Sequence, residues 1–339
     1  MVRVRIVLLC VISLIVFIHP VTASGESWTK VRQTNYGFPI TQYGRLLLVE
    51  NGRCVFLEDS PIKGQLAHKI NVVDSTGKLS VSLDPLKQID KATDLSVYDV
   101  SIGKSGKLAV SLVATSLSSQ FASLLLVYDS EGRLLTANKL PAGGEMGKLK
   151  VDDDDSIWGL RLGAAVESLE TTPLFSKFTG DGKVEQDYFD RKQFRLGRRV
   201  HSVVPRVGVL SFGLTTNKVW AWIPETQELI IFSKNGTDLQ RLYTDLPPFP
   251  RPELDRVRVH AAFMMESGYL IAPVAFTSTA GSSPSVSLAR WSPTRQWETL
   301  AHEGIENLKT RLVGIDGNNL IFVPLRGELV LSWESNTIQ

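Results

Sequence analysis

A pattern of strand, polar turn and strand returns along this chain about every 50 residues. Two interleaved series of turns can be followed, and within each series neighbouring turns are 49 to 60 residues apart. Each of the first five turns of the leading series precedes a turn of the trailing series by 25 to 28 residues. Unrelated loops do not keep such constant distances, so the spacing predicts an internally repeated fold. The leading turns contain Gly52, Gly106, Ser156, Gly208, Gly268 and Gly317, and the trailing turns contain Gly77, Gly132, Gly182, Gly236 and Thr294.

Each repeat consists of two hairpins, and therefore of four short strands. The segments between the turns are rich in Val, Leu, Ile, Phe and Trp and are bounded by Gly, Asp, Asn and Ser, which is the composition of strands and tight turns. No long helical period follows residue 23. Four strands in a repeat of this length are typical of the blades of a β-propeller. Residues 24–339 hold six repeats of about 53 residues, so we expect an all-β, six-bladed β-propeller.

The two ends of the chain are predicted to share the last blade. The partner of the leading turn at Gly317 would fall beyond Gln339, so this blade lacks one hairpin. The segment at residues 27–34 is the candidate for the missing fourth strand, and a blade made of both ends closes the ring without an open sheet edge. The three strands expected from the C-terminal end cover residues 310–315, 320–324 and 328–333.

Two segments carry a resemblance to a known group of propellers. They are VYDSEGRLL at residues 127–135 and the Asp-rich turn before Ile157-Trp158-Gly159. The chain resembles six-bladed propellers of the NHL-repeat and TolB-like group over nearly all of residues 24–339. The resemblance implies the fold, but its motifs are structural and leave the activity open.

The N-terminus has the layout of a secretory signal peptide. Arg3 and Arg5 precede an uncharged apolar run, and small residues follow it. This layout predicts that residues 1–23 are a signal peptide and that residues 24–339 form the propeller domain. The apolar run is shorter than the roughly 20 residues that span a bilayer as a helix. An uncleaved membrane anchor is the alternative.

Cysteine usage and charge point to an extracytoplasmic protein. Cys10 lies in the apolar run, so cleavage leaves Cys54 alone and no intrachain disulfide. Export without disulfides favours the periplasm of a bacterium, or secretion. Cleavage also lowers the formal charge from +2 to 0, because Arg3 and Arg5 are removed. A balanced charge excludes a strongly basic nucleic-acid binder, and 43% hydrophobic residues exclude a disordered chain.

Two similar segments mark candidate ligand-binding residues at the mouth of the channel. Arg199 and His201 stand just before one leading turn, and Arg258 and His260 stand in the same way before the next. Strand alternation sends Arg and His to one side, so the two histidines are expected to open the innermost strands of neighbouring blades at the loop-rich end. The equivalent residues of other blades are Asp99, Lys148 and Lys309, whose mixed charges favour a polar, water-filled channel.

Metal or anion binding is the less favoured interpretation of the charged segments. Two histidines without a third ligand make a weak metal site. Residues 152–155 are four aspartates that could bind Ca²⁺, but the run matches a β-turn, where Asp is favoured for local hydrogen bonds. The basic stretch at residues 191–199 could bind an anionic partner, although a solvated loop is favoured. The sequence therefore predicts no cofactor, with Ca²⁺ or another divalent metal as the alternative.

No sequence motif singles out a catalytic residue. The chain has no nucleophile elbow, P-loop, dinucleotide-binding glycine motif or zinc-protease motif. We therefore expect a non-catalytic binding module for a protein, peptide or glycan at the loop-rich end. No nucleic acid is expected as a partner, and a membrane is expected only if the N-terminal segment is retained. The alternative is a propeller hydrolase or lyase with a divalent metal in the central channel.

Overall fold

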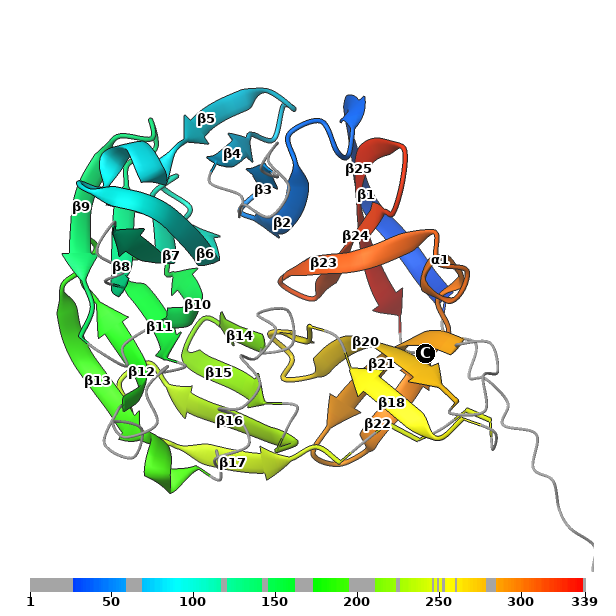
Figure 1. Ribbon diagram of the computed structural model, residues 1–339. Coiled ribbons are helices and arrows are strands. Elements are labelled where there is room, and N and C mark those ends of the chain that lie inside the picture. Colours follow the sequence, from blue (N-terminus) through cyan, green and yellow to red (C-terminus); the bar gives the residue numbers. More distant parts are fainter. Residues whose placement is uncertain are drawn as a thin grey trace, which may run out of the picture.

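Six antiparallel sheets surround a central axis in the computed structural model (Figure 1). This arrangement confirms the all-β, six-bladed β-propeller. The predicted signal peptide at residues 1–23 lies outside the described residues. None of the helices in the described part of the chain is long and apolar enough to cross a membrane. The structure describes residues 27–337 except residues 59–68, 117–120, 142–145, 162–172, 195–210, 224–225, 246, 249, 252–253, 260 and 279–284.

Blades 1 to 3 take their strands consecutively from the chain, from the axis outward. Blade 1 consists of β2 (Arg45–Glu50), β3 (Arg53–Glu58), β4 (Lys69–Val73) and β5 (Leu79–Leu83). Blade 2 consists of β6 (Ala92–Ile102), β7 (Leu108–Ser116), β8 (Phe121–Tyr128) and β9 (Leu134–Lys139). Blade 3 consists of β10 (Met146–Val151), β11 (Ile157–Arg161), β12 (Pro173–Phe178) and β13 (Val184–Asp190).

Blades 4 to 6 follow the same plan with two departures. The inner edge of blade 5 is shared by two short strands, and the outermost strand of blade 6 comes from the N-terminal end. Blade 4 consists of β14 (Ser211–Leu214), β15 (Lys218–Ile223), β16 (Glu228–Ser233) and β17 (Gln240–Tyr243). Blade 5 consists of β18 (Arg256–Val259), β19 (Phe263–Met264), β20 (Leu270–Thr277), β21 (Ser285–Ser292) and β22 (Gln296–Leu300). Blade 6 consists of β23 (Thr310–Asp316), β24 (Asn319–Pro324), β25 (Glu328–Thr337) and β1 (Ser27–Pro39). The short helices are η1 (Pro85–Gln88), η3 (Arg191–Gln193) and α1 (Glu303–Glu306).

The predicted closure of the ring by an N-terminal strand is confirmed. β1 pairs antiparallel with β25 and completes the blade begun by the C-terminal strands (Figure 1). Trp28 on β1 meets His302 and Phe322 edge to face, with ring centroids 5.1 and 6.2 Å away. Its indole Nε1 donates a hydrogen bond to the carbonyl oxygen of Ala301 at 2.6 Å. One side chain therefore fastens the first strand to the end of blade 5 and to blade 6.

A buried histidine next to this contact binds a carboxylate of β25. Nδ1 of His302 accepts the backbone N–H of Ile305 at 3.2 Å, so Nε2 carries the hydrogen and donates it to Glu334 at 3.0 Å. Ser332 donates a second hydrogen bond to Glu334 at 2.8 Å. Burial alone would raise the pKa of Glu334, but the hydrogen bonds from His302 and Ser332 hold the pKa below its ordinary value of 4.5.

Replacing Glu334 by Gln is expected to remove a pH-dependent part of the stability. Because the pKa of Glu334 is lowered by folding, its carboxylate stabilises the fold fully above about pH 4.5, and this contribution is lost as the pH falls below that value. The difference in unfolding free energy between the wild type and Glu334→Gln should therefore shrink between about pH 6 and about pH 3. Urea unfolding at several pH values measures it, and a constant difference would contradict the assignment.

Most predicted turns lie between the strands as expected, but the leading turn of blade 4 is wrong. β14 pairs with β15, and the turn between them covers residues 215–217, where the N–H of Thr215 donates to the carbonyl of Lys218 at 2.9 Å. Gly208 precedes β14 and lies outside the described residues. The turn reads Thr-Thr-Asn, and none of its residues has a positive φ, so it needs no glycine and the glycine spacing pointed to the wrong residue.

The core lies between neighbouring blades, where the sheet faces pack on each other. Trp158 of blade 3 meets Phe232 of blade 4 edge to face at 6.2 Å between ring centroids, and Trp222 of blade 4 meets Trp297 of blade 5 edge to face at 6.2 Å. The large aromatic area removed from water stabilises each contact between sheets. Six of the seven tryptophans are buried, namely Trp158, Trp220, Trp222, Trp291, Trp297 and Trp333.

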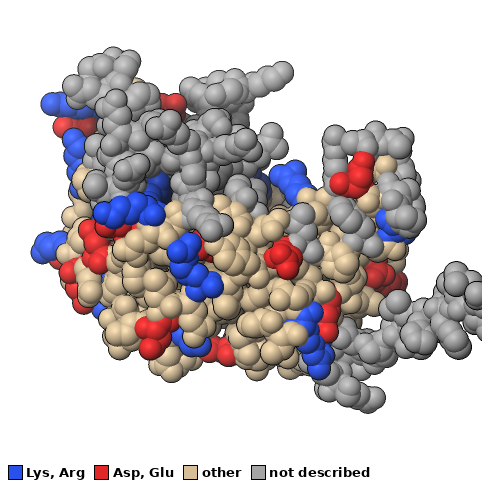
Figure 2. Space-filling view, turned by 90° about the horizontal axis from the view of Figure 1, so that it is seen from below, with Lys and Arg blue, Asp and Glu red and all other residues tan. Residues whose placement is uncertain are grey.

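Charges of both signs are interspersed on the outside of the ring. Figure 2 shows Lys and Arg beside Asp and Glu on the face in view, and its described residues form no large patch of one sign. This distribution agrees with the formal charge of 0 expected for residues 24–339. Such a surface offers little long-range attraction to a highly charged partner.

Candidate functional site

A cavity of about 820 Å³ lies at the centre of the ring. The innermost strands of all six blades line it, from the middle of these strands to the leading turns at one end. Its volume falls within the range of about 300–1,000 Å³ that is usual for small-molecule sites. We therefore take this cavity as the candidate functional site of the described part of the chain.

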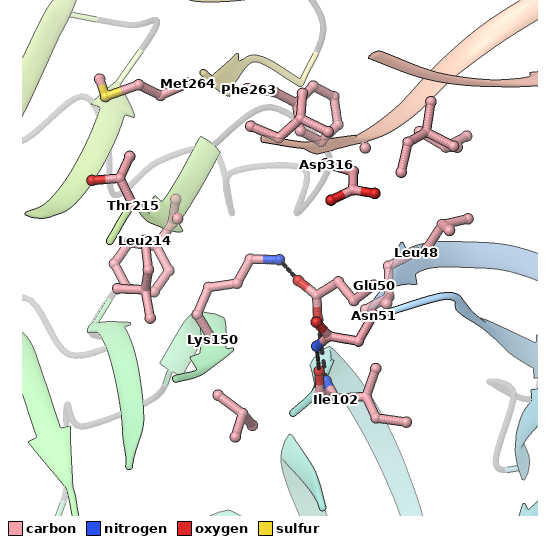
Figure 3. Close-up of a pocket in the computed structure, with 18 of the residues that line it drawn as sticks. Leu48, Glu50, Asn51, Ile102, Lys150, Leu214, Thr215, Phe263, Met264 and Asp316 are labelled. Carbon is pink, nitrogen blue, oxygen red and sulfur yellow. Dashed lines mark hydrogen bonds and ion pairs between the residues drawn. The ribbon is translucent and has the colours of Figure 1, made fainter. Parts of the chain in front are cut away.

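An ion pair between blades lies in the polar wall of the cavity. The ammonium group of Lys150 on β10 contacts the carboxylate of Glu50 on β2 (Figure 3). The other oxygen of Glu50 accepts hydrogen bonds from the hydroxyl of Ser101 at 2.9 Å and from the backbone N–H of Ile102 at 3.1 Å. Glu50 therefore joins blades 1, 2 and 3 at the channel.

Two opposing effects act on the charge of Lys150. Burial lowers the pKa of Lys150 to about 8, because removal from water disfavours the ammonium form. The adjacent carboxylate of Glu50 acts in the other direction, since it stabilises the ammonium. The pair places a donor and an acceptor side by side at the wall and adds no net charge to the cavity.

A second pair of opposite charges lies in the same wall. Nζ of Lys148 is 3.4 Å from Oδ1 of Asp99, and Oδ2 of Asp99 accepts the backbone N–H of Leu149 at 2.8 Å. Burial raises the pKa of Asp99, whereas the Lys148 ammonium favours its carboxylate form. Lys148 and Lys150 are two residues apart on β10 and thus project from the same face of the strand.

Hydrogen bonds between side chains and the next blade recur around the channel. In each case the two partners are 50 or 51 residues apart, which is about one repeat of the sequence. These bonds fix neighbouring innermost strands against each other and hold the wall rigid. They run from Asn51 Nδ2 to the carbonyl of Ile102 at 2.8 Å, from the N–H of Val151 to Ser101 Oγ at 2.9 Å, and from the N–H of Ala262 to Ser211 Oγ at 2.6 Å.

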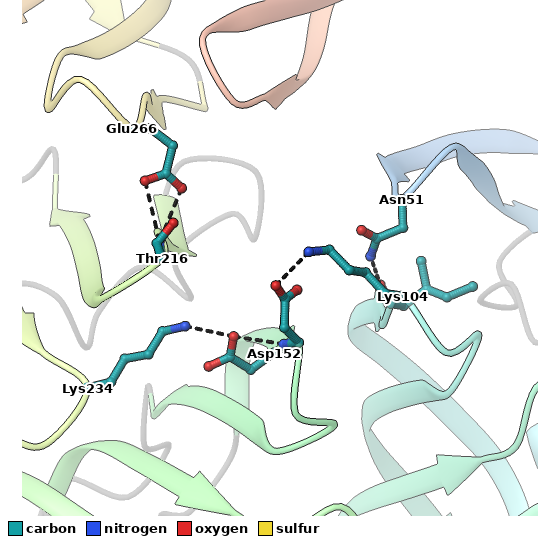
Figure 4. A network of polar contacts seen from close by, with 8 residues as sticks. Asn51, Lys104, Asp152, Thr216, Lys234 and Glu266 are labelled. Atoms are coloured by element: carbon teal, nitrogen blue, oxygen red, sulfur yellow. Dashed lines mark hydrogen bonds and ion pairs between the residues drawn. The ribbon is translucent and has the colours of Figure 1, made fainter.

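Polar contacts between neighbouring turns form a rim at one end of the cavity (Figure 4). Lys104 of blade 2 contacts Asp153 of blade 3 at 2.5 Å, and Lys234 of blade 4 contacts Asp152 at 2.7 Å. Glu266 of blade 5 accepts a hydrogen bond from a backbone N–H of blade 4 at 3.1 Å. The rim therefore carries both signs of charge, as the walls do.

The cavity also has an apolar side. Phe263 and Met264 on β19 line it across from Lys150, and Leu214 at the end of β14 lines it beside Lys150 (Figure 3). Met264 is buried, while Phe263 is half-buried and exposes part of its ring. An apolar surface that faces two fixed pairs of donors and acceptors makes the cavity amphipathic.

Two of the residues predicted for a ligand site come together in this cavity. Asp99 and Lys148, proposed as equivalent positions of neighbouring blades, contact each other and line the wall. Arg258 is exposed on β18, and neither it nor Lys309 lines the cavity that the described residues form. Lys309 is exposed just before β23 and pairs with Glu303 at 3.2 Å.

The other three predicted site residues, Arg199, His201 and His260, lie outside the described residues. Most of the connections at the loop-rich end of the ring also lie there, so a ligand site at that end stays a prediction. The cavity reaches the opposite end, where the leading turns lie.

The acidic run at residues 152–155 forms the predicted turn between β10 and β11, and its carboxylates have partners. Within the described residues, no group of three or more His, Cys, Asp or Glu side chains is arranged to hold a metal ion. The run instead joins blade 3 to its neighbours and shapes its own turn. The partners are Lys234 for Asp152, Lys104 for Asp153, the N–H of Ser156 for Asp154, and Lys107 and Ser105 for Asp155.

Three important cavity residues did not stand out in the sequence, namely Glu50, Lys150 and Phe263. Strand alternation offers a signal for one of them, since Lys150 is two residues after the predicted Lys148 and must share its face. Glu50 contacts Lys150 from a strand two blades away, and no local sequence pattern indicates that these two residues are in contact. Phe263 lies on a two-residue strand, β19, which is too short to give a periodic signal.

No protein-family model and no curated protein sequence matches the chain. Solved structures resemble it over most of its length. The structure of a streptogramin B lyase shares 13% identity, covers 93% of this chain and 99% of its own, and has a TM-score of 0.40. A putative exported protein from Bacteroides fragilis shares 9% identity, covers 92% and 95%, and has a TM-score of 0.49. A luciferin-regenerating enzyme shares 11% identity, covers 92% and 97%, and has a TM-score of 0.44. At these identities the likeness concerns the fold alone.

Proposed function

We propose that the protein is an exported, non-catalytic binding module that takes a small polar ligand, or one end of a larger protein, peptide or glycan, into the central cavity. The observation that supports this proposal is the amphipathic wall, in which fixed ion pairs and the apolar side chains of Leu214, Phe263 and Met264 line one cavity. Specific sites are mostly pre-formed and combine apolar surface with convergent polar groups. This cavity combines an apolar side with polar groups that converge on it, and its lining is polar and apolar in similar measure.

The contacts of the buried carboxylates favour binding over catalysis. Glu50 and Asp99 each accept a backbone N–H and also contact a lysine ammonium. A general base must be free to take a proton from a substrate, and a carboxylate with both oxygens engaged is poorly placed to do so. The wall is therefore better suited to hold a ligand than to transfer its protons.

Export is proposed from the N-terminal sequence. Positive charge, an apolar run and small residues precede the propeller in that order, and the proposed location is the bacterial periplasm or the outside of the cell. Mass determination of the mature protein tests this, since cleavage after Ala23 predicts a chain that begins at Ser24. A retained N-terminal segment would point to a membrane anchor instead.

A substitution that fills the cavity tests the proposed site. Thr215 lines the cavity (Figure 3), so Thr215→Trp should abolish ligand binding, because the indole occupies the space that the ligand needs. Leu135→Trp is the matched control, since Leu135 is half exposed on the outermost strand of blade 2. A thermal-shift screen of small metabolites, peptides and glycans gives the readout. Ligands that stabilise the wild type and Leu135→Trp but not Thr215→Trp support the proposal, and equal stabilisation of all three contradicts it.

The alternative of a metal-dependent hydrolase or lyase calls for a separate measurement. Elemental analysis of the purified protein should find no stoichiometric divalent metal, and EDTA should leave the melting temperature unchanged. One tightly bound metal per chain, lost in a His201→Ala, His260→Ala double variant, would overturn the non-catalytic proposal.

A further inference from the structure

We propose that the ligand of the central cavity is a short, uncharged saccharide whose hydroxyl groups bind the wall formed by Lys148 and Lys150 and whose C–H face lies on Phe263. This inference rests on the proposed binding function and names the chemical class of its ligand. It follows from the charge, the hydrogen-bonding capacity and the apolar surface of the cavity, which are considered in turn below.

Four charged side chains of the inner wall are already balanced in two pairs. Lys150 contacts Glu50, and Lys148 contacts Asp99. A charged ligand at this depth would compete with one member of a pair and would leave the other as an unpaired charge, which is costly away from water. A neutral ligand leaves both pairs intact, so the wall favours a molecule without net charge.

The same wall retains capacity for hydrogen bonds with both donors and acceptors. An ammonium group has three N–H donors, and among the described residues each of these two lysines contacts one carboxylate. Glu50, Asp99 and Asn51 line the same cavity and carry carboxylate and amide oxygens that can accept hydrogen bonds. A hydroxyl group donates one hydrogen bond and accepts two. A molecule with several adjacent hydroxyls therefore matches alternating donors and acceptors better than an amine or a carboxylate does.

Phe263 supplies the apolar surface that a sugar ring also needs. Its ring is half-buried and lines the cavity across from Lys150 (Figure 3). The face of an aromatic ring carries partial negative charge and attracts the positive edge of a C–H group. The pyranose ring has such a C–H face on one side and hydroxyl groups at its edge. The cavity of about 820 Å³ is large enough for more than one sugar unit.

Isothermal titration calorimetry of the full-length mature protein with cellotriose, maltotriose and triacetylchitotriose tests the inference. At least one of them should bind at one molecule per chain, with a dissociation constant that changes less than about twofold between low and high salt, because a neutral ligand is not screened. Phe263→Leu should weaken binding by about 2- to 10-fold, and Lys150→Met by about 10-fold or more. Lys183→Met should have no effect, because Lys183 pairs with Asp181 on an exposed turn away from the cavity.

The outcomes separate the ligand class from the proposed function. Failure of all three saccharides at millimolar concentration overturns the inference. Binding of spermidine or trilysine that Thr215→Trp abolishes also overturns it but leaves the binding module standing. Saccharide binding that persists in Thr215→Trp and Phe263→Leu contradicts the cavity as the site of both proposals. Should Lys150→Met fail to fold, Phe263→Leu still gives the decisive comparison.

Discussion

Deletion of residues 27–34 is expected to lower the melting temperature by about 10 °C or more. These residues form most of β1, which pairs with β25 and closes the ring. The loss includes the ladder of hydrogen bonds, the packing of Trp28 and the stacking of Arg32 on Trp333 at 3.9 Å. Together these contribute about 5 kcal/mol, and a chain of this size loses about 2 °C per kcal/mol. The deletion also exposes the edge of β25, which favours aggregation.

Point variants of β1 test the closure of the ring without shortening the chain. Trp28→Ala should destabilise the protein by about 2–3 kcal/mol, because the indole packs on His302 and Phe322. Thr29→Ala is the matched control, since Thr29 is exposed on the same strand and its replacement should leave the stability unchanged. Differential scanning calorimetry of the three variants should show the largest fall in melting temperature for the deletion, a smaller fall for Trp28→Ala and none for Thr29→Ala. A melting temperature that the deletion leaves unchanged would contradict the role of β1.

Removal of Glu50 is expected to have the second large effect, about 3 kcal/mol of unfolding free energy. Glu50→Ala removes the partner of Lys150 and the acceptor of the hydrogen bonds from Ser101 and Ile102. The buried groups that stay behind without partners account for most of the loss. The figure lies at the lower end of the range for buried pairs, because the Lys150 side chain is 29% exposed.

A double-mutant cycle isolates the ion pair from the other contacts of Glu50. Lys150→Met alone should cost about 1–2 kcal/mol, and the double variant Glu50→Ala, Lys150→Met should cost less than the sum of the single variants by about 1–2 kcal/mol. Asp181 and Lys183, which form an exposed pair at 2.8 Å, serve as the control and should show no measurable coupling. Strict additivity at Glu50 and Lys150 would show that the pair adds nothing to the stability of the channel.

Much of the architecture follows from the spacing of turns along the chain. Glycine or polar residues recur at nearly constant distances, and Gly132 shows why, since its φ of +82° is a conformation that other residues rarely adopt. Such turns force a hairpin wherever they stand, so the number of blades can be predicted without contacts. Glycine spacing misses the turn at residues 215–217, because no residue of that turn adopts the positive φ that favours glycine.

The closing strand could also be predicted, because each repeat has four strands and the last repeat has only three after residue 309. The expected strand at residues 27–34 falls within β1 (Ser27–Pro39). The contact that fastens it could not be predicted, since Trp28 and Phe322 are close only after the ring has closed. No local sequence pattern indicates which residues at the two ends of a chain will be in contact.

In the candidate site too, the local sequence pattern predicts some residues, and only the closure of the ring brings in the others. The sequence by itself determined which residues occupy equivalent places in the repeats, and so it named Asp99 and Lys148, which contact each other in the channel. Only the tertiary structure decided that Glu50 reaches Lys150 and that Phe263 faces them across a cavity. The physical reason is that blades meet at the axis only when the sheets are packed side by side. Strand periodicity sets the face to which a side chain points, whereas the closure of the ring sets its partner.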